Sequence, residues 1–181
     1  MFRLIGFCGL KTAGKTEAAK AACKAIGAVR ISFADPLYAA LAAATGCEVS
    51  WLRNPRNKDK KIPGTNCLVR HALQTLGTEW GRDLVDPNLW VNQARPKILA
   101  AKLLDAPAVF EDLRFPNELS LIREFGGEAI WIEREGLLPA ADTHASETSI
   151  SSADADRLFK NMGTLAEFRA SVSMYLLEKK Q

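Results

Sequence analysis

The sequence lacks the features that would direct it into a membrane or through a secretory route. None of its apolar stretches approaches the ~20 residues that span a bilayer. The N-terminus has one early arginine and then a strand-like run, without the apolar core and cleavage site of a signal peptide. We therefore expect a cytoplasmic protein.

Metal-ligating side chains are also scarce. The chain has four cysteines without a C-x-x-C pair, and its two histidines, His71 and His144, lie far apart. This spacing argues against a structural zinc site. Cys8 and Cys23 fall on core-facing positions, which favours small buried side chains over a disulfide in a reducing compartment.

Bulk composition points to one soluble globular domain. The 181 residues are 48% apolar and 25% charged, which suits a single domain with a sizeable core. The net charge of +3 permits anionic substrates but does not by itself indicate nucleic acid.

The most informative segment is residues 9–16, "GLKTAGKT", which fits the P-loop pattern G-x-x-x-x-G-K-S/T. A short apolar run precedes it, and an alanine-rich helical pattern follows it. Such a loop turns backbone N–H groups toward a phosphate, and the helix N-terminus adds its partial positive charge. Lys15 would bridge the β- and γ-phosphates of a nucleotide, and the Thr16 hydroxyl would bind Mg²⁺.

Strand and helix patterns alternate along the rest of the chain, which predicts a three-layer α/β domain with a mainly parallel sheet. We expect a helix over 68–76 that ends at Gly77, and a helix from Asp86-Pro87 that Pro96 breaks or kinks. Thr164 and Glu167 form a capping box for the last helix. The other expected strands are 29–33, 107–111, 129–132 and 157–160, and the other expected helices are 37–45 and 117–125. We expect a mobile basic loop at 53–66 and a loop or flexible lid at 135–150.

Glu111 and Asp112 follow a buried strand, where open α/β sheets bind ligands. An acid at such a strand tip usually holds Mg²⁺, and we favour Asp112 for that role.

Four arginines, Arg70, Arg82, Arg114 and Arg134, lie near predicted strand tips or between the second and third strands. As a set they suit a kinase whose acceptor already carries a phosphate, because two anions must be brought together. A phosphate acceptor needs no general base, whereas a hydroxyl acceptor would need one, and Asp35 is the one candidate.

Several further segments, in the same order along the chain, resemble the phage deoxynucleoside monophosphate kinase family. They are "FADPL" (33–37), "RHALQTLGTEWGR" (70–82), "EDLRFPNE" (111–118), "GGEAIWIER" (126–134), "DTHASE" (142–147) and "NMGTLAEF" (161–168). A more distant likeness is to dephospho-CoA kinase, which also carries a late Asn-x-Gly turn.

The resemblance implies a nucleoside monophosphate kinase fold, with five parallel strands in the order 2-3-1-4-5. It implies one P-loop kinase domain over 1–181, with an NMP-binding insertion at about 36–104 and a lid at about 134–150. The reaction would transfer a phosphoryl group from ATP to a dNMP with Mg²⁺, giving ADP and a dNDP for deoxynucleotide biosynthesis. If a phage encodes the chain, the compartment is the host cytoplasm.

The resemblance also implies roles for individual residues. Lys15, Asp112 and Arg114 would be catalytic, and Thr16 and Asp112 would hold the metal. Arg70 and Arg82 would hold the monophosphate, Gln74 and Thr78 would meet its base or sugar, and Asp35 would meet the deoxyribose or the metal shell. Arg114 and Glu118 would lie beside the transfer point, Arg134 would meet adenine or a phosphate, and Asn161 and Gly163 would lie at the adenine edge. The ATP-binding set is Gly9, Lys11, Thr12, Ala13, Gly14, Lys15, Thr16, Glu17, Arg134, Asn161 and Gly163.

The lid sequence departs from the family pattern, because it has no arginine after Arg134. Charge stabilisation would then rest on Arg114 and the basic segment 53–61, while His144 and Glu147 either contribute or face solvent.

Two other functions stay open on the sequence alone. One is a kinase of a hydroxymethyl pyrimidine in DNA, with the basic segment as the DNA contact and Asp35 as base. The other is a non-catalytic regulatory module, which would need a damaged motif. The preferred base and a homodimeric state are not specified by the sequence.

Overall fold

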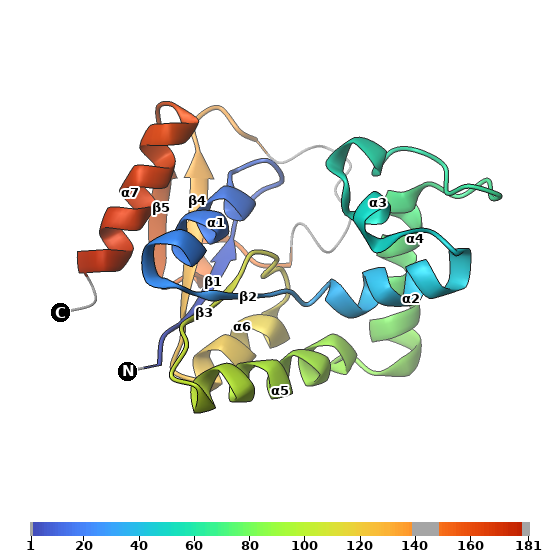
Figure 1. Ribbon diagram of the computed structural model, residues 1–181, viewed down its shortest axis with the longest axis horizontal. Coiled ribbons are helices and arrows are strands. Elements are labelled where there is room, and N and C mark those ends of the chain that lie inside the picture. The colour runs from blue at the N-terminus through green and yellow to red at the C-terminus, as the bar shows by residue number, and fades with distance from the viewer. Residues whose placement is uncertain (1, 139–148, 179–181) are drawn as a thin grey trace. The chain divides into compact units, whose positions relative to one another are not determined.

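The computed structural model describes residues 2–138 and 149–178 (Figure 1). The chain divides into two compact units. The first unit comprises residues 1–32 and 94–181, and the second comprises residues 33–93. His144, Glu147 and most of the expected lid lie outside the described residues.

The first unit contains one five-stranded parallel sheet with the strand order β2-β3-β1-β4-β5. This confirms the expected order and the α/β fold class. Gly6 of the central strand pairs with Phe110 on one side and with Ala129 on the other. The strands are β1 (Leu4–Cys8), β2 (Val29–Ile31), β3 (Ala108–Phe110), β4 (Glu128–Arg134) and β5 (Arg157–Asn161).

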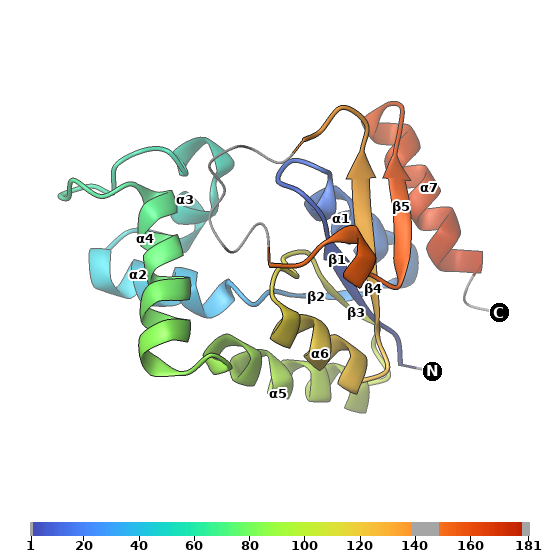
Figure 2. The same cartoon turned by 180° about the vertical axis from the view of Figure 1, so that it is seen from behind.

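Helices cover both faces of this sheet (Figures 1 and 2). Helices α1 (Lys15–Ile26) and α7 (Leu165–Glu178) pack together on one face, over a core that includes Ile5, Val109 and Phe168. On the other face α6 (Pro116–Glu124) lies against β1 and β4. The predicted three layers are therefore present. A short 3₁₀ turn, η4 (Ser152–Asp154), precedes β5.

The last helix begins as predicted and differs in one detail. Glu167 accepts hydrogen bonds from the backbone N–H and the hydroxyl of Thr164, at 2.7 and 2.8 Å, which confirms the capping box. The spacing of the apolar residues in this helix predicts one face with Leu165, Phe168, Val172, Tyr175 and Leu176. Phe168, Val172 and Leu176 are buried, whereas Leu165 is half exposed.

The sequence predicts a break or a kink at Pro96. Helix α5 (Leu89–Leu103) continues through Pro96, so the break is wrong. Proline removes one N–H bond to the carbonyl four residues earlier, here that of Asn92. Both Asn92 and Pro96 are exposed, and water can satisfy that carbonyl. The helix also begins three residues after Asp86, whose carboxylate accepts the Asn88 N–H at 2.6 Å.

The second unit is helical. Its elements are α2 (Asp35–Thr45), α3 (Val49–Arg53), the 3₁₀ turn η1 (Pro55–Asn57), α4 (Val69–Thr75) and the π-helix η2 (Leu76–Val85). Leu41, Leu52, Ile62 and Val69 form its core. Gly77 does not end the helix after residue 76, because the chain continues into η2.

The basic segment 53–66 is more structured than a featureless loop. Asn57 is buried and its amide donates to the Trp51 carbonyl at 3.0 Å. Ile62 belongs to the core of the second unit, and the backbone of Lys61 forms an isolated antiparallel β-bridge with Leu68. Among the described residues, every helix is too short or too polar to span a lipid bilayer.

Candidate active site

The P-loop connects β1 to α1 and has the backbone geometry of a phosphate cradle. Gly9, Thr12 and Gly14 have φ values of 132°, 67° and 114°. At Gly9 a side chain is excluded, since a Cβ would lie 2.5 Å from the Ile132 carbonyl oxygen. Thr12 holds a left-handed conformation that a β-branched residue rarely adopts, and such strain concentrates at functional sites.

Lys15 is anchored over the loop that precedes it. Its ammonium donates to the carbonyl oxygens of Gly9 and Leu10, at 2.7 and 2.8 Å. The charge is therefore held beside the backbone N–H groups of the P-loop, where a β- or γ-phosphate would bind.

The last strand supports the loop from one side. The side-chain amide of Asn161, at the end of β5, donates to the Ala13 carbonyl at 2.7 Å. Glycine is favoured at position 14, because its φ of 114° strains any other residue, and a Cβ there would also lie 2.7 Å from the Asn161 Nδ2 atom. Asn161 was expected at the adenine edge, and the structure shows it bound to the P-loop.

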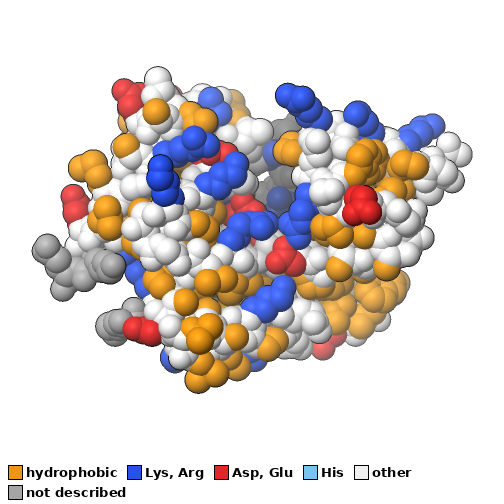
Figure 3. All heavy atoms as spheres, viewed as in Figure 1, with side chains coloured by type: hydrophobic (Ala, Val, Ile, Leu, Met, Phe, Trp, Pro, Cys, Tyr) orange, Lys and Arg blue, Asp and Glu red, His pale blue; other side chains and the backbone are white. Residues whose placement is uncertain are grey.

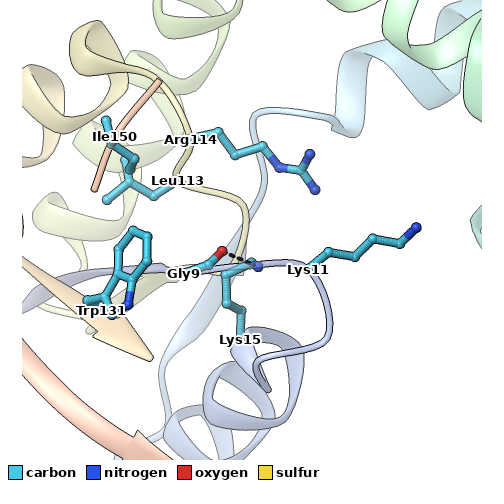
Figure 4. A pocket seen from close by; sticks show the side chains of 7 residues that line it. All are labelled: Gly9, Lys11, Lys15, Leu113, Arg114, Trp131 and Ile150. Atoms are coloured by element: carbon cyan, nitrogen blue, oxygen red, sulfur yellow. Dashed lines mark hydrogen bonds between the residues drawn. The ribbon is translucent and has the colours of Figure 1, made fainter. Parts of the chain in front are cut away.

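A pocket opens beside the P-loop (Figure 4). Three cationic side chains line it: Lys11, Lys15 and Arg114. Apolar side chains of Leu113, Trp131 and Ile150 line the rest. The pocket thus combines positive charge for phosphate groups with apolar walls, and the apolar residues were not anticipated from the sequence.

The two strand-tip acids have different surroundings. Asp112 accepts a hydrogen bond from the Ser32 hydroxyl at 2.6 Å. Glu111 pairs with Arg30 at 2.6 Å, and its other oxygen is buried without a hydrogen-bond partner among the described residues. Ser32 was missed because nothing in the sequence distinguishes it from other residues at the end of a strand.

The donor set near the P-loop suits Mg²⁺. Asp112 and Thr16 offer a carboxylate and an exposed hydroxyl, and Mg²⁺ prefers such oxygen ligands. The described residues contain no cluster of three or more His, Cys, Asp or Glu side chains. Mg²⁺ needs none in a kinase, because the substrate phosphates and waters complete its shell.

Glu118 is 2% exposed and lies on the first turn of α6. Its carboxylate accepts the backbone N–H groups of Arg114 and Phe115, at 2.7 and 3.0 Å. The contact caps the helix and fixes the backbone of Arg114. Glu118 is thus placed to position Arg114.

Three other residues of the expected ATP-binding set occupy the rim of the P-loop or the helices beside it. The guanidinium of Arg134, at the end of β4, donates to the Thr12 carbonyl at 3.4 Å. Glu17 instead pairs with Lys20 and with Arg169 of α7. The hydrogen bond from Lys20, assisted by Arg169 and opposed by partial burial, lowers the pKa of Glu17. Gly163 forms the turn before α7 with φ of 78°.

Cys8 lies at the end of β1, directly before the loop. Its side chain is 2% exposed, and burial raises the pKa of the thiol to about 12. The thiol therefore stays protonated at neutral pH and is unsuited to act as a nucleophile.

The expected acceptor-binding residues Asp35, Arg70, Gln74, Thr78 and Arg82 all lie in the second unit. Asp35 pairs with Arg53, whose guanidinium carbon lies 4.3 Å from the centroid of the Tyr38 ring. Lys58 lies 4.2 Å from the same centroid and donates to the Tyr38 hydroxyl.

Arg53 and Lys58 were anticipated only as part of the basic segment 53–61, because their shared contact with Tyr38 depends on tertiary packing. Figure 3 shows Lys and Arg side chains along one edge of this unit.

The two arginines that are expected to bind the acceptor are held differently. Arg70 forms a two-point pair with Asp59, at 2.7 and 3.1 Å, on the surface. Arg82 is 9% exposed and donates to the Pro87 carbonyl at 3.3 Å. Gln74, Thr78 and Arg82 follow one another at intervals of four along α4 and η2, which places them near one face of a helix.

Comparison with known proteins identifies the family. The sequence model for deoxynucleotide monophosphate kinases matches residues 56–172. The chain belongs to the deoxynucleotide monophosphate kinase family. It is 33% identical over 191 aligned positions to a protein of Acanthamoeba polyphaga mimivirus named as a deoxynucleotide monophosphate kinase, covering 93% of each chain. A deoxynucleoside-5'-monophosphate kinase of Escherichia phage T5 shares 40% identity over 68 residues, which are 38% of this chain and 26% of that protein.

Solved structures share the fold of this family member. Dephospho-CoA kinase from Campylobacter jejuni superposes with a TM-score of 0.53 at 19% identity, covering 98% of this chain and 97% of that one. A sugar kinase from Janibacter gives a TM-score of 0.52 at 12% identity, covering 97% and 95%. These likenesses support the kinase fold. The family match and the named relatives identify the protein as a phosphotransferase.

Proposed function

We propose that the protein transfers the γ-phosphoryl group of ATP to the phosphate of a deoxynucleoside monophosphate, giving ADP and a dNDP. The observation that carries this proposal is the pocket of Lys11, Lys15 and Arg114 against the P-loop. Three cations around one phosphate cradle suit the joining of two anionic substrates.

In this reaction an oxygen of the acceptor phosphate forms the new bond to the γ-phosphorus. The bond between that phosphorus and the β–γ bridging oxygen breaks, and ADP leaves with the electron pair. The acceptor oxygen is already anionic, so no general base is required. Lys15 and the loop N–H groups hold the donor phosphates, and Arg114 stabilises the charge on the transferred group.

Thr16 and Asp112 are the residues that would hold Mg²⁺, which neutralises phosphate charge in kinases when bound. Ser32 would orient Asp112 through the hydrogen bond of 2.6 Å between them. The apolar side chains of Trp131, Leu113 and Ile150 would keep water from competing with the acceptor.

On the donor side, Arg134 and Gly163 would contact the nucleotide at the rim of the P-loop. Asn161 would act mainly by holding the loop through Ala13, and Glu17 would stabilise the contact between α1 and α7.

On the acceptor side, Arg82 and Arg70 would bind the monophosphate, and Gln74 and Thr78 would meet its base or sugar. Asp35 would contact the deoxyribose. Arg53 and Lys58, both against Tyr38, would add positive charge to this unit. The named relatives are viral, so the host cytoplasm is the proposed compartment.

The test is an ADP-release assay with ATP–Mg²⁺ against the four common dNMPs, their ribonucleotide forms and DNA that contains hydroxymethyl-dUMP. Turnover on one or more free dNMPs supports the proposal and identifies the preferred base. Activity on the modified DNA alone would instead favour a DNA kinase with Asp35 as base. Tight ATP binding without any turnover would point to a regulatory module.

A further inference from the structure

The second unit contains an uncommon element, the ten-residue π-helix η2 (Leu76–Val85). π-Helices occur mostly as single turns and often at functional sites, because their backbone is less favourable than that of an α-helix. A longer one needs contacts that stabilise it. Here the Asp86 N–H bonds to the Gly81 carbonyl, five residues earlier, at 3.0 Å.

Trp90 supplies such contacts. It lies near the start of α5 with 5% of its surface exposed. Its indole N–H donates to the Gly77 carbonyl at 2.7 Å, in buried surroundings. Its ring lies so close to Gly81 that a Cβ there would be 2.5 Å from the ring carbon Cζ2. One side chain therefore binds η2 at two points, one helical turn apart.

Arg82 directly follows Gly81, the residue against which the Trp90 ring lies. Its guanidinium donates to the Pro87 carbonyl, in the connection between η2 and α5. The same connection leads into the first turn of α5, which carries Trp90. The buried Arg82 side chain thus bonds to the segment that leads to Trp90, and Thr78 directly follows Gly77, whose carbonyl accepts the Trp90 indole N–H.

We infer that Trp90 is a positioning residue for acceptor binding: through Gly77 and Gly81 it holds η2 so that Arg82 and Thr78 present themselves to the dNMP. This inference rests on the proposed function. It concerns a residue that contacts no substrate itself, and it predicts an effect on the acceptor that is separate from any effect on ATP.

The test is a double-mutant cycle between Trp90→Phe and Arg82→Gln. Trp90→Phe removes the N–H donor and keeps an aromatic ring. We expect KM for the dNMP to rise about fivefold, the value of one lost hydrogen bond, while KM for ATP stays within about twofold. If Trp90 acts through Arg82, the double variant loses little more than Arg82→Gln alone. Additive losses, or equal rises in both KM values, would overturn the inference.

Two further variants keep the test decisive. Leu84→Ala is the matched control, because Leu84 also lies in η2 but is 78% exposed, and it should leave both KM values unchanged. Gly81→Ala should displace the indole and reproduce the selective rise in dNMP KM if Trp90→Phe does not fold. Thermal melts select the variants that are folded at the assay temperature.

The failures of the two proposals are distinguishable. If the wild-type protein turns over no dNMP, the proposed function fails. If the wild type is active and the folded Trp90→Phe and Gly81→Ala variants keep the wild-type dNMP KM, only the role of Trp90 is wrong.

Discussion

The side-chain amide of Asn161 donates a hydrogen bond of 2.7 Å to the carbonyl oxygen of Ala13, across 148 positions of sequence. This contact joins the end of β5 to the P-loop and gives Asn161 a role that does not depend on the base of the donor nucleotide. The alternative role, at the adenine edge, predicts a different pattern of binding.

Asn161→Ala separates these roles. Loss of the support for the loop should raise KM for ATP and for GTP by a similar factor, about fivefold for one hydrogen bond. Steady-state kinetics with both donors measures it. The neighbouring Met162→Ala, at an exposed position, is the control. A change confined to ATP would assign Asn161 to adenine recognition instead.

Lys15→Ala should lower kcat by at least about a hundredfold, because a cation aimed at the transferred group is lost. The fold should persist, since the hydrogen bonds of the lysine to Gly9 and Leu10 stay within its own loop. Circular dichroism and kinetics together check this, with Lys24→Ala, on the last turn of α1, as control. Near-normal turnover would remove Lys15 from the mechanism.

Arg82→Gln should raise KM for the dNMP by about ten- to a hundredfold, the value of a lost charge-assisted hydrogen bond, with little change for ATP. Initial rates with each substrate varied in turn give the two constants. Arg157→Gln, at an exposed position of β5, is the control. Equal losses for both substrates would exclude Arg82 from an acceptor-specific role.

Glu118→Ala should destabilise the protein by about 1–3 kcal/mol, because the partly buried N–H groups of Arg114 and Phe115 lose a buried acceptor. It should also lower kcat, since Arg114 loses its support, and Glu118→Gln should recover much of both losses. Urea unfolding and kinetics measure the two effects. Glu124→Gln on the same helix should keep kcat and cost much less stability than Glu118→Ala, because its ion pair with Arg95 is on the surface. If Glu118→Ala lost stability but kept full kcat, the carboxylate would cap α6 without positioning Arg114.

Glu17 gives a prediction for pH. Its pKa is lowered below the usual 4.5, first by the hydrogen bond from Lys20 and then by Arg169, against partial burial. Its stabilising contribution is therefore fully present above pH 4.5 and is lost as the pH falls through the lower, folded value.

Glu17→Gln should cost less than about 1 kcal/mol at pH 7, because solvent screens its partners. The difference between variant and wild type should shrink below pH 4.5 in urea unfolding, and KM for ATP should stay unchanged. A large rise in that KM would return Glu17 to the ATP site.

Local patterns were sufficient to predict much of this structure. The P-loop, the capping box at Thr164 and the alternation of strands and helices depend on neighbours in sequence, and the family resemblance supplied the strand order. The errors arose where contacts between residues far apart in sequence determine the local structure. Gly77 looks like a helix end, but it serves as the acceptor for the Trp90 indole. Pro96 continues its helix because the freed carbonyl is exposed.

In the candidate site, too, residues in local motifs could be predicted, whereas residues brought together by the fold could not. Lys15 and Arg114 could be predicted because their motifs are contiguous, and the structure places them around one pocket. Trp131 and Ile150 reach that pocket from separate elements, and Ser32 reaches Asp112 across 80 positions. Nothing in their local sequence marks them as site residues.

The most direct test of the central claim is ³¹P NMR of ATP–Mg²⁺ and the preferred dNMP with the wild-type protein. The account predicts that the γ-phosphate signal of ATP declines as the β-phosphate signal of the dNDP grows in equal amount, with little inorganic phosphate. Conversion of ATP to ADP and inorganic phosphate alone, with the dNMP signal unchanged, would contradict it.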